Sequence, residues 1–168
     1  MPEFVEKHRA SVRVCLPGQD PVDGQIALGP LSRTRQGSET ILELLNTPQR
    51  VVPLMLPEFQ TVLLVTRLNI DWVLAGAGVD VDLVCPRSYI VSREESVHVT
   101  FSDGRTIDGM IQMELPEGMN RASDFLNCPD EFFPMRTRIG IVIVNKTRIR
   151  DTRVHSASPQ AIPTAHET

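Results

Sequence analysis

Two stretches of the chain carry the same alternation of hydrophobic and polar positions. Residues 97–101 (Val-His-Val-Thr-Phe) read as a β-strand with one buried face, and Ser102-Asp103-Gly104-Arg105 then predicts a tight hairpin turn. Residues 12–16 (Val-Arg-Val-Cys-Leu) show the same alternation before a longer turn that contains two prolines. The pattern therefore predicts two β-hairpins of one kind.

These hairpins belong to a longer internal repeat. Three blocks align in the same order, separated only by gaps of loop size. The blocks are residues 12–26 over 97–111 at an offset of 85, residues 44–54 over 125–135 at an offset of 81, and residues 62–70 over 141–149 at an offset of 79. Such self-similarity predicts one structural unit present twice.

Each copy predicts a short helix after its hairpin. In the first copy Ser38 can cap a helix from Glu39 to Asn46, and in the second Ser123 or Asn120 can cap a turn over 122–127. Three further strands follow in each copy. They cover 51–55, 61–66 and 70–74 in the first copy, and 132–138, 140–145 and 149–154 in the second. The continuous apolar runs of the longer strands favour burial on both faces.

A glycine lies inside the second strand of each copy, where Asp23-Gly24 aligns with Asp108-Gly109. Glycine at such a place indicates a bulge or sharp bend in a small curled sheet. An alternative interpretation makes the two aspartates ligands or catalytic carboxylates. It is the weaker interpretation, because each copy supplies one acid without a second at fixed spacing.

The order of elements resembles that of an SH3-like or Sm-like small barrel. Ser102-Asp103-Gly104-Arg105, Ser123-Asp124-Phe125-Leu126-Asn127 and Phe132-Phe133-Pro134 are similar to motifs of a group of uncharacterised bacterial small-barrel domains. Sm domains carry their helix at the start, whereas these units place it between the second and third strands. The resemblance implies a mainly β fold of two tandem small barrels, each with one inserted helix, and no established activity.

The repeat sets the expected domain boundaries. They are a first barrel over 10–75, a bridging segment over 76–95, a second barrel over 96–155 and a disordered tail over 156–168. Apolar residues alternate with acids over 79–83, so the bridge is expected to add one or two strands that pack against a barrel or bridge the two barrels.

Composition narrows the class of protein. Hydrophobic residues make up 41% and charged residues 23% of the chain, and the formal net charge of −4 argues against a general polyanion binder. No apolar run approaches the roughly 18 residues of a membrane span. Cys15, Cys85 and Cys128 are odd in number and lack metal-ligand spacing, so we expect a cytoplasmic protein without disulfides or a metal site.

We expect a protein that is not an enzyme and needs no cofactor. The sequence contains no phosphate-binding glycine loop, nucleophile elbow or paired acid spacing. The strongest surface signal is a set of six basic residues against one acid over 132–155. They are Arg136, Arg138, Lys146, Arg148, Arg150 and Arg153.

Two functions follow as hypotheses from that signal. We expect a scaffold or adaptor that binds a partner protein or a second copy, through the basic residues and an apolar surface around Trp72, Leu56 and Phe59. The alternative is RNA binding, because Lys146, Arg148 and Arg150 would share one side of an extended strand and could contact phosphates. Exposed aromatic residues for base stacking are scarce, which favours the scaffold.

Overall fold

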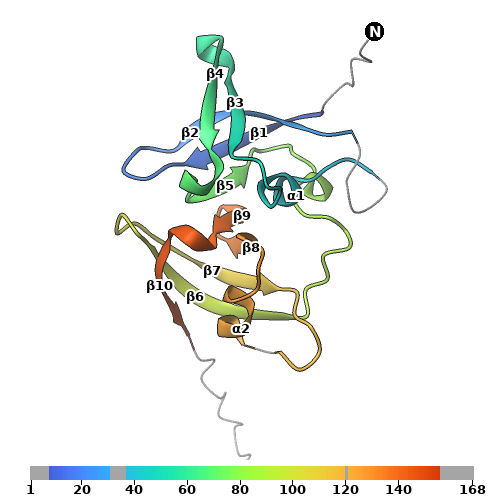
Figure 1. Ribbon diagram of the computed structural model, residues 1–168, viewed down its shortest axis with the longest axis vertical. Helices are drawn as coiled ribbons and strands as arrows, with labels where there is room; N and C mark the ends of the chain where they lie inside the picture. Colours follow the sequence, from blue (N-terminus) through green and yellow to red (C-terminus); the bar gives the residue numbers. More distant parts are fainter. Residues whose placement is uncertain (1–7, 31–36, 120, 156–168) are drawn as a thin grey trace, which may run out of the picture.

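The computed structural model describes residues 8–30, 37–119 and 121–155. Within these residues, ten strands form one antiparallel sheet, and two short α-helices accompany them. Figure 1 shows two halves stacked on each other, with β1 to β5 and α1 above, and β6 to β10 and α2 below. The prediction of a mainly β fold is confirmed.

Both halves contain the same elements in the same order. The first half consists of β1 (His8–Cys15), β2 (Val22–Leu28), α1 (Ile41–Leu45), β3 (Val51–Leu56), a 3-10 turn (Pro57–Phe59), β4 (Thr61–Thr66), a 3-10 turn (Arg67–Asn69) and β5 (Trp72–Ala75). The second half consists of β6 (Arg93–Phe101), β7 (Thr106–Met113), α2 (Ala122–Leu126), β8 (Phe132–Thr137), β9 (Gly140–Asn145), a 3-10 turn (Lys146–Arg148) and β10 (Ile149–Val154).

The sheet runs in the order β10-β6-β7-β8-β9-β5-β1-β2-β3-β4. In each half the fifth strand lies beside the first, and the fourth strand lies at the far side. The sheet is not closed, so the expected pair of closed barrels is not observed. The reason is that the free side of β5 pairs with β9 of the other half and not with β4.

The offsets of the sequence alignment also relate the strand pairings. Val12 lies opposite Gly24 in the first hairpin, and Val97 lies opposite Gly109 in the second, which is a shift of 85 on both strands. The β3–β4 and β8–β9 pairings are related by 81 and 79, and the β1–β5 and β6–β10 pairings by 85 and 79. An equivalent residue can therefore be assigned for each strand position.

The helix α1 begins at a capping box. The side chain of Thr40 accepts a hydrogen bond from the Glu43 N–H at 3.2 Å, and the Glu43 carboxylate accepts one from the Thr40 N–H at 2.8 Å. The predicted cap, Ser38, is therefore wrong. Thr-x-x-Glu is the stronger start signal because both side chains satisfy backbone donors.

At α2 the residue that precedes the helix is Arg121. Its N–H donates to the Asp124 carboxylate at 3.2 Å. Ser123, one of the two predicted caps, lies inside the helix, and Asn120, the other, lies outside the described residues.

The two mid-strand glycines allow a close approach of neighbouring backbone. A Cβ atom at Gly109 would lie 2.5 Å from the Arg136 carbonyl oxygen, and one at Gly24 would lie 2.7 Å from that of Met55. Any side chain here would push the third strand of each half away from the second. The glycines are thus explained by close strand packing.

The aspartates before these glycines form cross-strand pairs on the surface. The Asp23 Oδ1 lies 2.7 Å from the Arg13 Nε, and the Asp108 Oδ1 lies 2.7 Å from the His98 Nδ1. In each case the two partners face each other in the first hairpin of their half. Both acids therefore have a structural role in the hairpins.

The bridge differs from its prediction, because residues 76–92 contain no strand. A 3-10 turn covers Val81–Leu83, the Leu42 N–H donates to the Val84 carbonyl at 3.0 Å, and the Tyr89 hydroxyl donates to the Gln112 carbonyl at 2.8 Å. Turns and single hydrogen bonds to both halves take the place of a strand ladder. The predicted tail, 156–168, lies outside the described residues.

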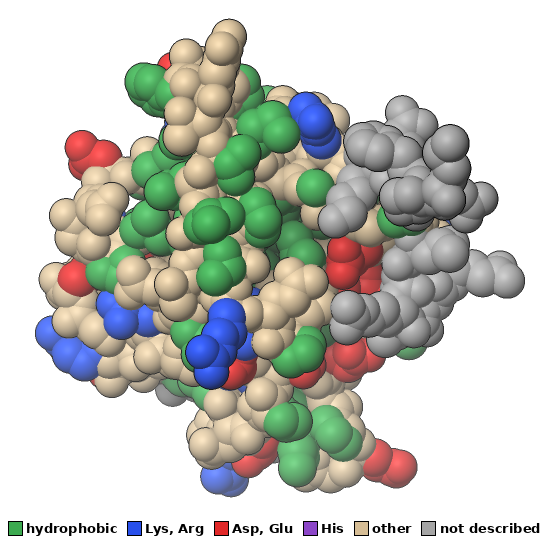
Figure 2. Space-filling view, turned by 45° about the horizontal axis from the view of Figure 1, so that its top comes forward, with side chains coloured by type: hydrophobic (Ala, Val, Ile, Leu, Met, Phe, Trp, Pro, Cys, Tyr) green, Lys and Arg blue, Asp and Glu red, His purple; other side chains and the backbone are tan. Residues whose placement is uncertain are grey.

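The strand β4 also departs from expectation, because only one of its faces is buried. Val65 points into the core, whereas Val62 and Leu64 are exposed to 51% and 67%. Figure 2 shows hydrophobic side chains gathered in a strip on the face that carries the β3–β4 hairpin. The exposure follows from the position of β4 at the end of the sheet, where no described strand covers it.

Candidate functional site

The junction between the two halves, which we call the β5–β9 seam, shows how this unit binds a neighbour. Trp72 lies opposite Val144, and Leu74 lies opposite Val142, in an antiparallel pairing that makes the sheet continuous. The seam joins the fifth strand of one half to the fourth strand of the other.

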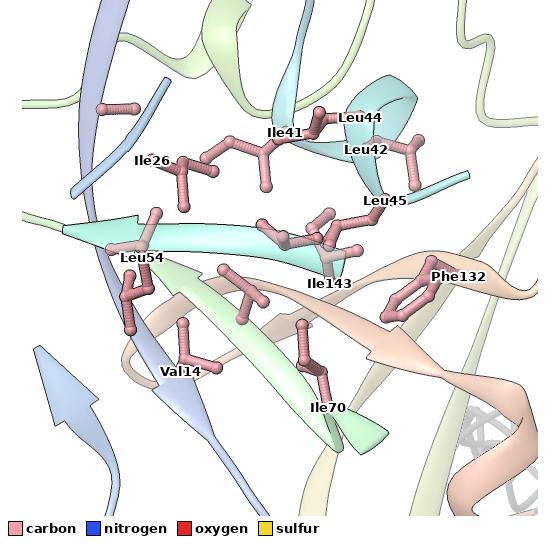
Figure 3. Packing of buried hydrophobic residues seen from close by; sticks show 14 of the residues in the cluster. Val14, Ile26, Ile41, Leu42, Leu44, Leu45, Leu54, Ile70, Phe132 and Ile143 are labelled. Carbon is pink, nitrogen blue, oxygen red and sulfur yellow. The ribbon is translucent and has the colours of Figure 1, made fainter. Parts of the chain in front are cut away.

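Apolar side chains cross the seam in both directions. Phe132 and Ile143 come from the second half, yet each is only 1% exposed and belongs to the core of the first half. Figure 3 shows both side chains pointing into that core beside Leu45 and Ile70. In the opposite direction, Trp72 packs against the core of the second half.

A buried acid is the polar centre of the seam. Asp71 of the first half is fully buried and lies 3.0 Å from the Arg148 Nε and 3.3 Å from the Arg105 Nη2 of the second half. Burial raises the pKa of Asp71, while the hydrogen bond from Arg148 opposes that rise. Arg105 also donates to the Leu16 and Gln19 carbonyls, which fixes the second hairpin turn against the first.

Side chains at the helix ends complete the seam. The Asn46 amide accepts from the Phe132 N–H at 2.9 Å and donates to the Phe132 carbonyl at 3.1 Å. Arg67 donates to the Leu45 carbonyl at the end of α1 and pairs with Glu131 of the second half. These contacts hold the start of β8 against the end of α1.

The candidate interaction surface is the exposed side of the β3–β4 hairpin at the open end of the sheet, which we call the β4 edge and define by Val51 of β3 and by Val62 and Leu64 of β4. Their exposed fractions are 39%, 51% and 67%. The alignment offsets identify their equivalents in the second half as Phe132, Ile141 and Ile143. The residues that fill the seam in one half are therefore the residues left exposed in the other.

The three predicted interface residues lie in different environments. Trp72 is half-buried inside the β5–β9 seam, and Leu56 is half-buried against the core of the first half. Phe59 is 72% exposed at the tip of the β3–β4 hairpin, adjacent to the β4 edge. Sequence reasoning overlooked Val62 and Leu64, whose apolar run predicted a fully buried strand.

The six predicted basic residues do not form one surface. Lys146–Arg148 is a 3-10 turn, so the expected alignment of Lys146, Arg148 and Arg150 along one side of an extended strand is wrong. Lys146 donates to two carbonyls at the end of α2, where burial lowers its pKa, and Arg148 binds Asp71. Both side chains therefore stabilise the fold.

The other four basic residues are exposed. Arg136 pairs with Glu94 at 2.9 Å, and Arg150 pairs with Asp151 at 3.0 Å. Within the described residues, Arg138 and Arg153 have no ion-pair partner within 4 Å. Arg138 and Arg153 could therefore contact phosphate groups directly, whereas Arg136 and Arg150 would first have to leave their ion pairs.

No protein-family model, curated protein or solved structure matches this chain. Among the described residues, no cluster of three or more His, Cys, Asp or Glu side chains is placed to hold a metal ion. None of the described helices has the length and apolar character to cross a membrane.

Proposed function

We propose that this protein is a non-enzymatic interaction module of two tandem copies of one small-barrel-like unit, and that the β4 edge takes up a strand from a partner protein. The observation that carries the proposal is the exposure of Val62 and Leu64 where the equivalent residues of the second half, Ile141 and Ile143, pack in a seam. The matching registers of the two halves support the tandem arrangement.

The sequence of β4 favours pairing with another strand. Natural edge strands are commonly protected by charged residues, prolines or bulges, since an open edge pairs with other chains. The strand Thr61–Thr66 (Thr-Val-Leu-Leu-Val-Thr) contains neither a charge nor a proline, and its pairing with β3 is regular over all six residues. A partner strand would supply backbone hydrogen bonds to this edge and cover its side chains.

The free energy available at the β4 edge is appreciable. Burying a Val or Leu side chain completely is worth about 1.5 to 3 kcal/mol. Scaled by exposed fractions of 39%, 51% and 67%, the three residues together offer about 3 kcal/mol in addition to the hydrogen bonds of the new strand pair. A free energy of this size is enough to favour a partner strand that covers these three side chains over one that leaves them exposed.

A photo-crosslinking experiment in cells tests the proposal. A photoreactive phenylalanine analogue replaces Leu64 in one variant and Ile139 in the control, because Ile139 is also exposed, to 63%, but lies in the β8–β9 turn. We expect mass spectrometry to identify crosslinks from position 64 to a defined extended segment of a protein, and to find them lost when Val62→Lys is added. Equal crosslinking from positions 64 and 139 would contradict the proposal.

A further inference from the structure

We propose that the strand received by the β4 edge is β10 of a second copy of this chain, so that the protein assembles head to tail. This inference rests on the proposed function and names the partner of the same surface. Within one chain, a fifth strand (β5) already pairs with a fourth strand (β9). The remaining fifth strand, β10, and the remaining fourth strand, β4, each pair with one described strand only.

The core below β10 lacks the cover that the seam gives to the first half. Leu45 and Ile70, which lie under the β5–β9 seam, are each only 1% exposed. Their equivalents in the second half, Leu126 and Ile149, are only partly buried. The second half therefore has an incomplete site at the position where the first half receives Phe132 and Ile143.

The β4 edge has the side chains that this site needs. Applying the register of the β5–β9 seam to β10 and β4 places Thr152 opposite Leu64 and, when the pairing is extended by one residue, Val154 opposite Val62. Val154 is 47% exposed in the isolated chain, so this pairing covers exposed valines on both strands. In such a contact the β4 edge lies over Ile149 of the neighbouring copy, as Ile143 lies over Ile70 within one chain.

Polar side chains around the two edges agree with the same contact. Asn127 is the equivalent of Asn46, and its exposed side chain has no hydrogen-bond partner within the described residues. In the assembly it faces the backbone of Val51, the equivalent of Phe132. Arg150 and Asp20 are the equivalents of Asp71 and Arg105, so the two charges of that ion pair are exchanged.

Two differences make the contact between copies weaker than the β5–β9 seam. Asp151 and Arg153 stand at the positions of Trp72 and Leu74, so one face of β10 offers charges where β5 offers apolar side chains. The pair Arg67–Glu131 has no counterpart, since Lys146 would face a basic residue, Arg50. We therefore expect a reversible assembly that depends on protein concentration.

The symmetry of the contact determines the form of the assembly. The β4 edge and the β10 edge are different surfaces, so their contact is heterologous, and each copy can bind one neighbour at either end. Such contacts produce a closed ring when the rotation between neighbours closes, and a filament when it does not. The smallest closed form is a ring of two copies, in which the β4 edge of each copy pairs with β10 of the other.

Sedimentation velocity over a range of concentrations is the first test. We expect the mean mass of the intact protein to rise with concentration, and Leu64→Lys to weaken association by about tenfold or more, as loss of a central interface residue does. Ile139→Lys is the matched control and should associate as the unmodified chain does. Circular dichroism of both variants establishes that they are folded.

Directed disulfide formation tests the register. Thr152→Cys and Leu64→Cys are made as separate variants in a chain whose three native cysteines are replaced by serine. We expect oxidation of the mixture to give a crosslinked pair, and oxidation of either variant alone to give none. Arg150→Asp should weaken association, and the added change Asp20→Arg should restore it.

Three results would overturn the inference. These are a mass that stays monomeric at all concentrations, a crosslink of Thr152→Cys with itself, and an association that Leu64→Lys leaves unchanged. Crosslinks from position 64 to a different protein, with a monomeric mass, would overturn self-assembly and leave the proposed function standing. Absence of any specific crosslink from position 64 would remove both.

Discussion

A pair of equivalent substitutions examines the asymmetry between the two halves directly. Ile143→Ala removes a side chain that is 1% exposed inside the β5–β9 seam, and Leu64→Ala removes one that is 67% exposed at the equivalent position on β4. Both changes delete three carbon atoms from the fourth strand of a half. The number of atoms removed is therefore the same, and the two variants differ in how deeply the removed atoms are buried.

The expected loss of stability differs by a large factor. Deleting three buried methylene equivalents costs about 2.4 kcal/mol of transfer free energy, and the cavity left in a packed core raises this to about 3 to 4 kcal/mol. For Leu64 only the buried third of the side chain contributes, which gives about 0.8 kcal/mol and no closed cavity. The free energies of unfolding of the two variants should thus differ by about 2 to 3 kcal/mol.

Urea unfolding followed by circular dichroism measures this difference. With a denaturant slope of about 2 kcal/mol per molar urea, Ile143→Ala should lower the midpoint by about 1.5 M and Leu64→Ala by less than about 0.5 M. The experiment is done in dilute solution, where copies do not associate. Equal midpoint shifts would refute the reasoning, because they would mean that the β4 edge is covered in the single chain or that the seam is not packed.

Three further predictions address other parts of the chain. Gly109→Ala should destabilise the fold by about 1 to 3 kcal/mol in urea unfolding, because its Cβ would lie 2.5 Å from a carbonyl oxygen of β8; an unchanged midpoint would contradict the close approach. Hydrogen bonds from two backbone N–H groups lower the pKa of Asp103 from 3.8 to about 2. Its contribution to stability is therefore present above pH 3.8 and is lost as the pH falls towards 2. Asp103→Asn should reduce the change in the free energy of unfolding between pH 3.8 and pH 2. Burial raises the pKa of Cys15 to about 11 and that of Cys85 to about 12. Alkylation of the native chain at mildly alkaline pH should therefore modify Cys128 first, as mass spectrometry can show. Faster modification of Cys15 would contradict its burial.

The arrangement of strands along the chain could be predicted from the sequence because each hairpin carries its own local signal. Alternation and turn residues predict β1, β2, β6 and β7, and the alignment offsets later match every strand pairing within the halves. The helix cap was harder, since Ser38 and Thr40 are both capping residues, and only Glu43 three positions after Thr40 distinguishes them. The hairpin strands and the start of α1 are therefore determined by residues close together in the sequence.

Neither the open sheet nor the candidate surface could be predicted, because both depend on which strand edges meet. Thr61–Thr66 and Gly140–Asn145 are equally apolar runs, so the sequence predicts burial for both. Burial differs because β9 pairs with β5 and β4 has no described partner on its outer side. The prediction of one basic surface failed for a related reason, since the buried acid that binds Arg148, Asp71, comes from the other half of the chain.

The charges on β10 acquire a reason once the two outer edges are considered together. Joining the two halves through β5 and β9 leaves one fourth strand, β4, and one fifth strand, β10, at the ends of the sheet, and the proposed contact brings these two edges together. If β10 carried apolar residues like Trp72 and Leu74, the contact between chains would be stronger, and assemblies would persist at much lower protein concentrations. Asp151 and Arg153 oppose that outcome by charging one face of β10, while Val154 and Ile149 keep the other face apolar. On this reasoning Asp151→Trp combined with Arg153→Leu should convert a reversible assembly into a persistent one, and a sedimentation profile that keeps its concentration dependence in this variant would show that the two charges do not limit association.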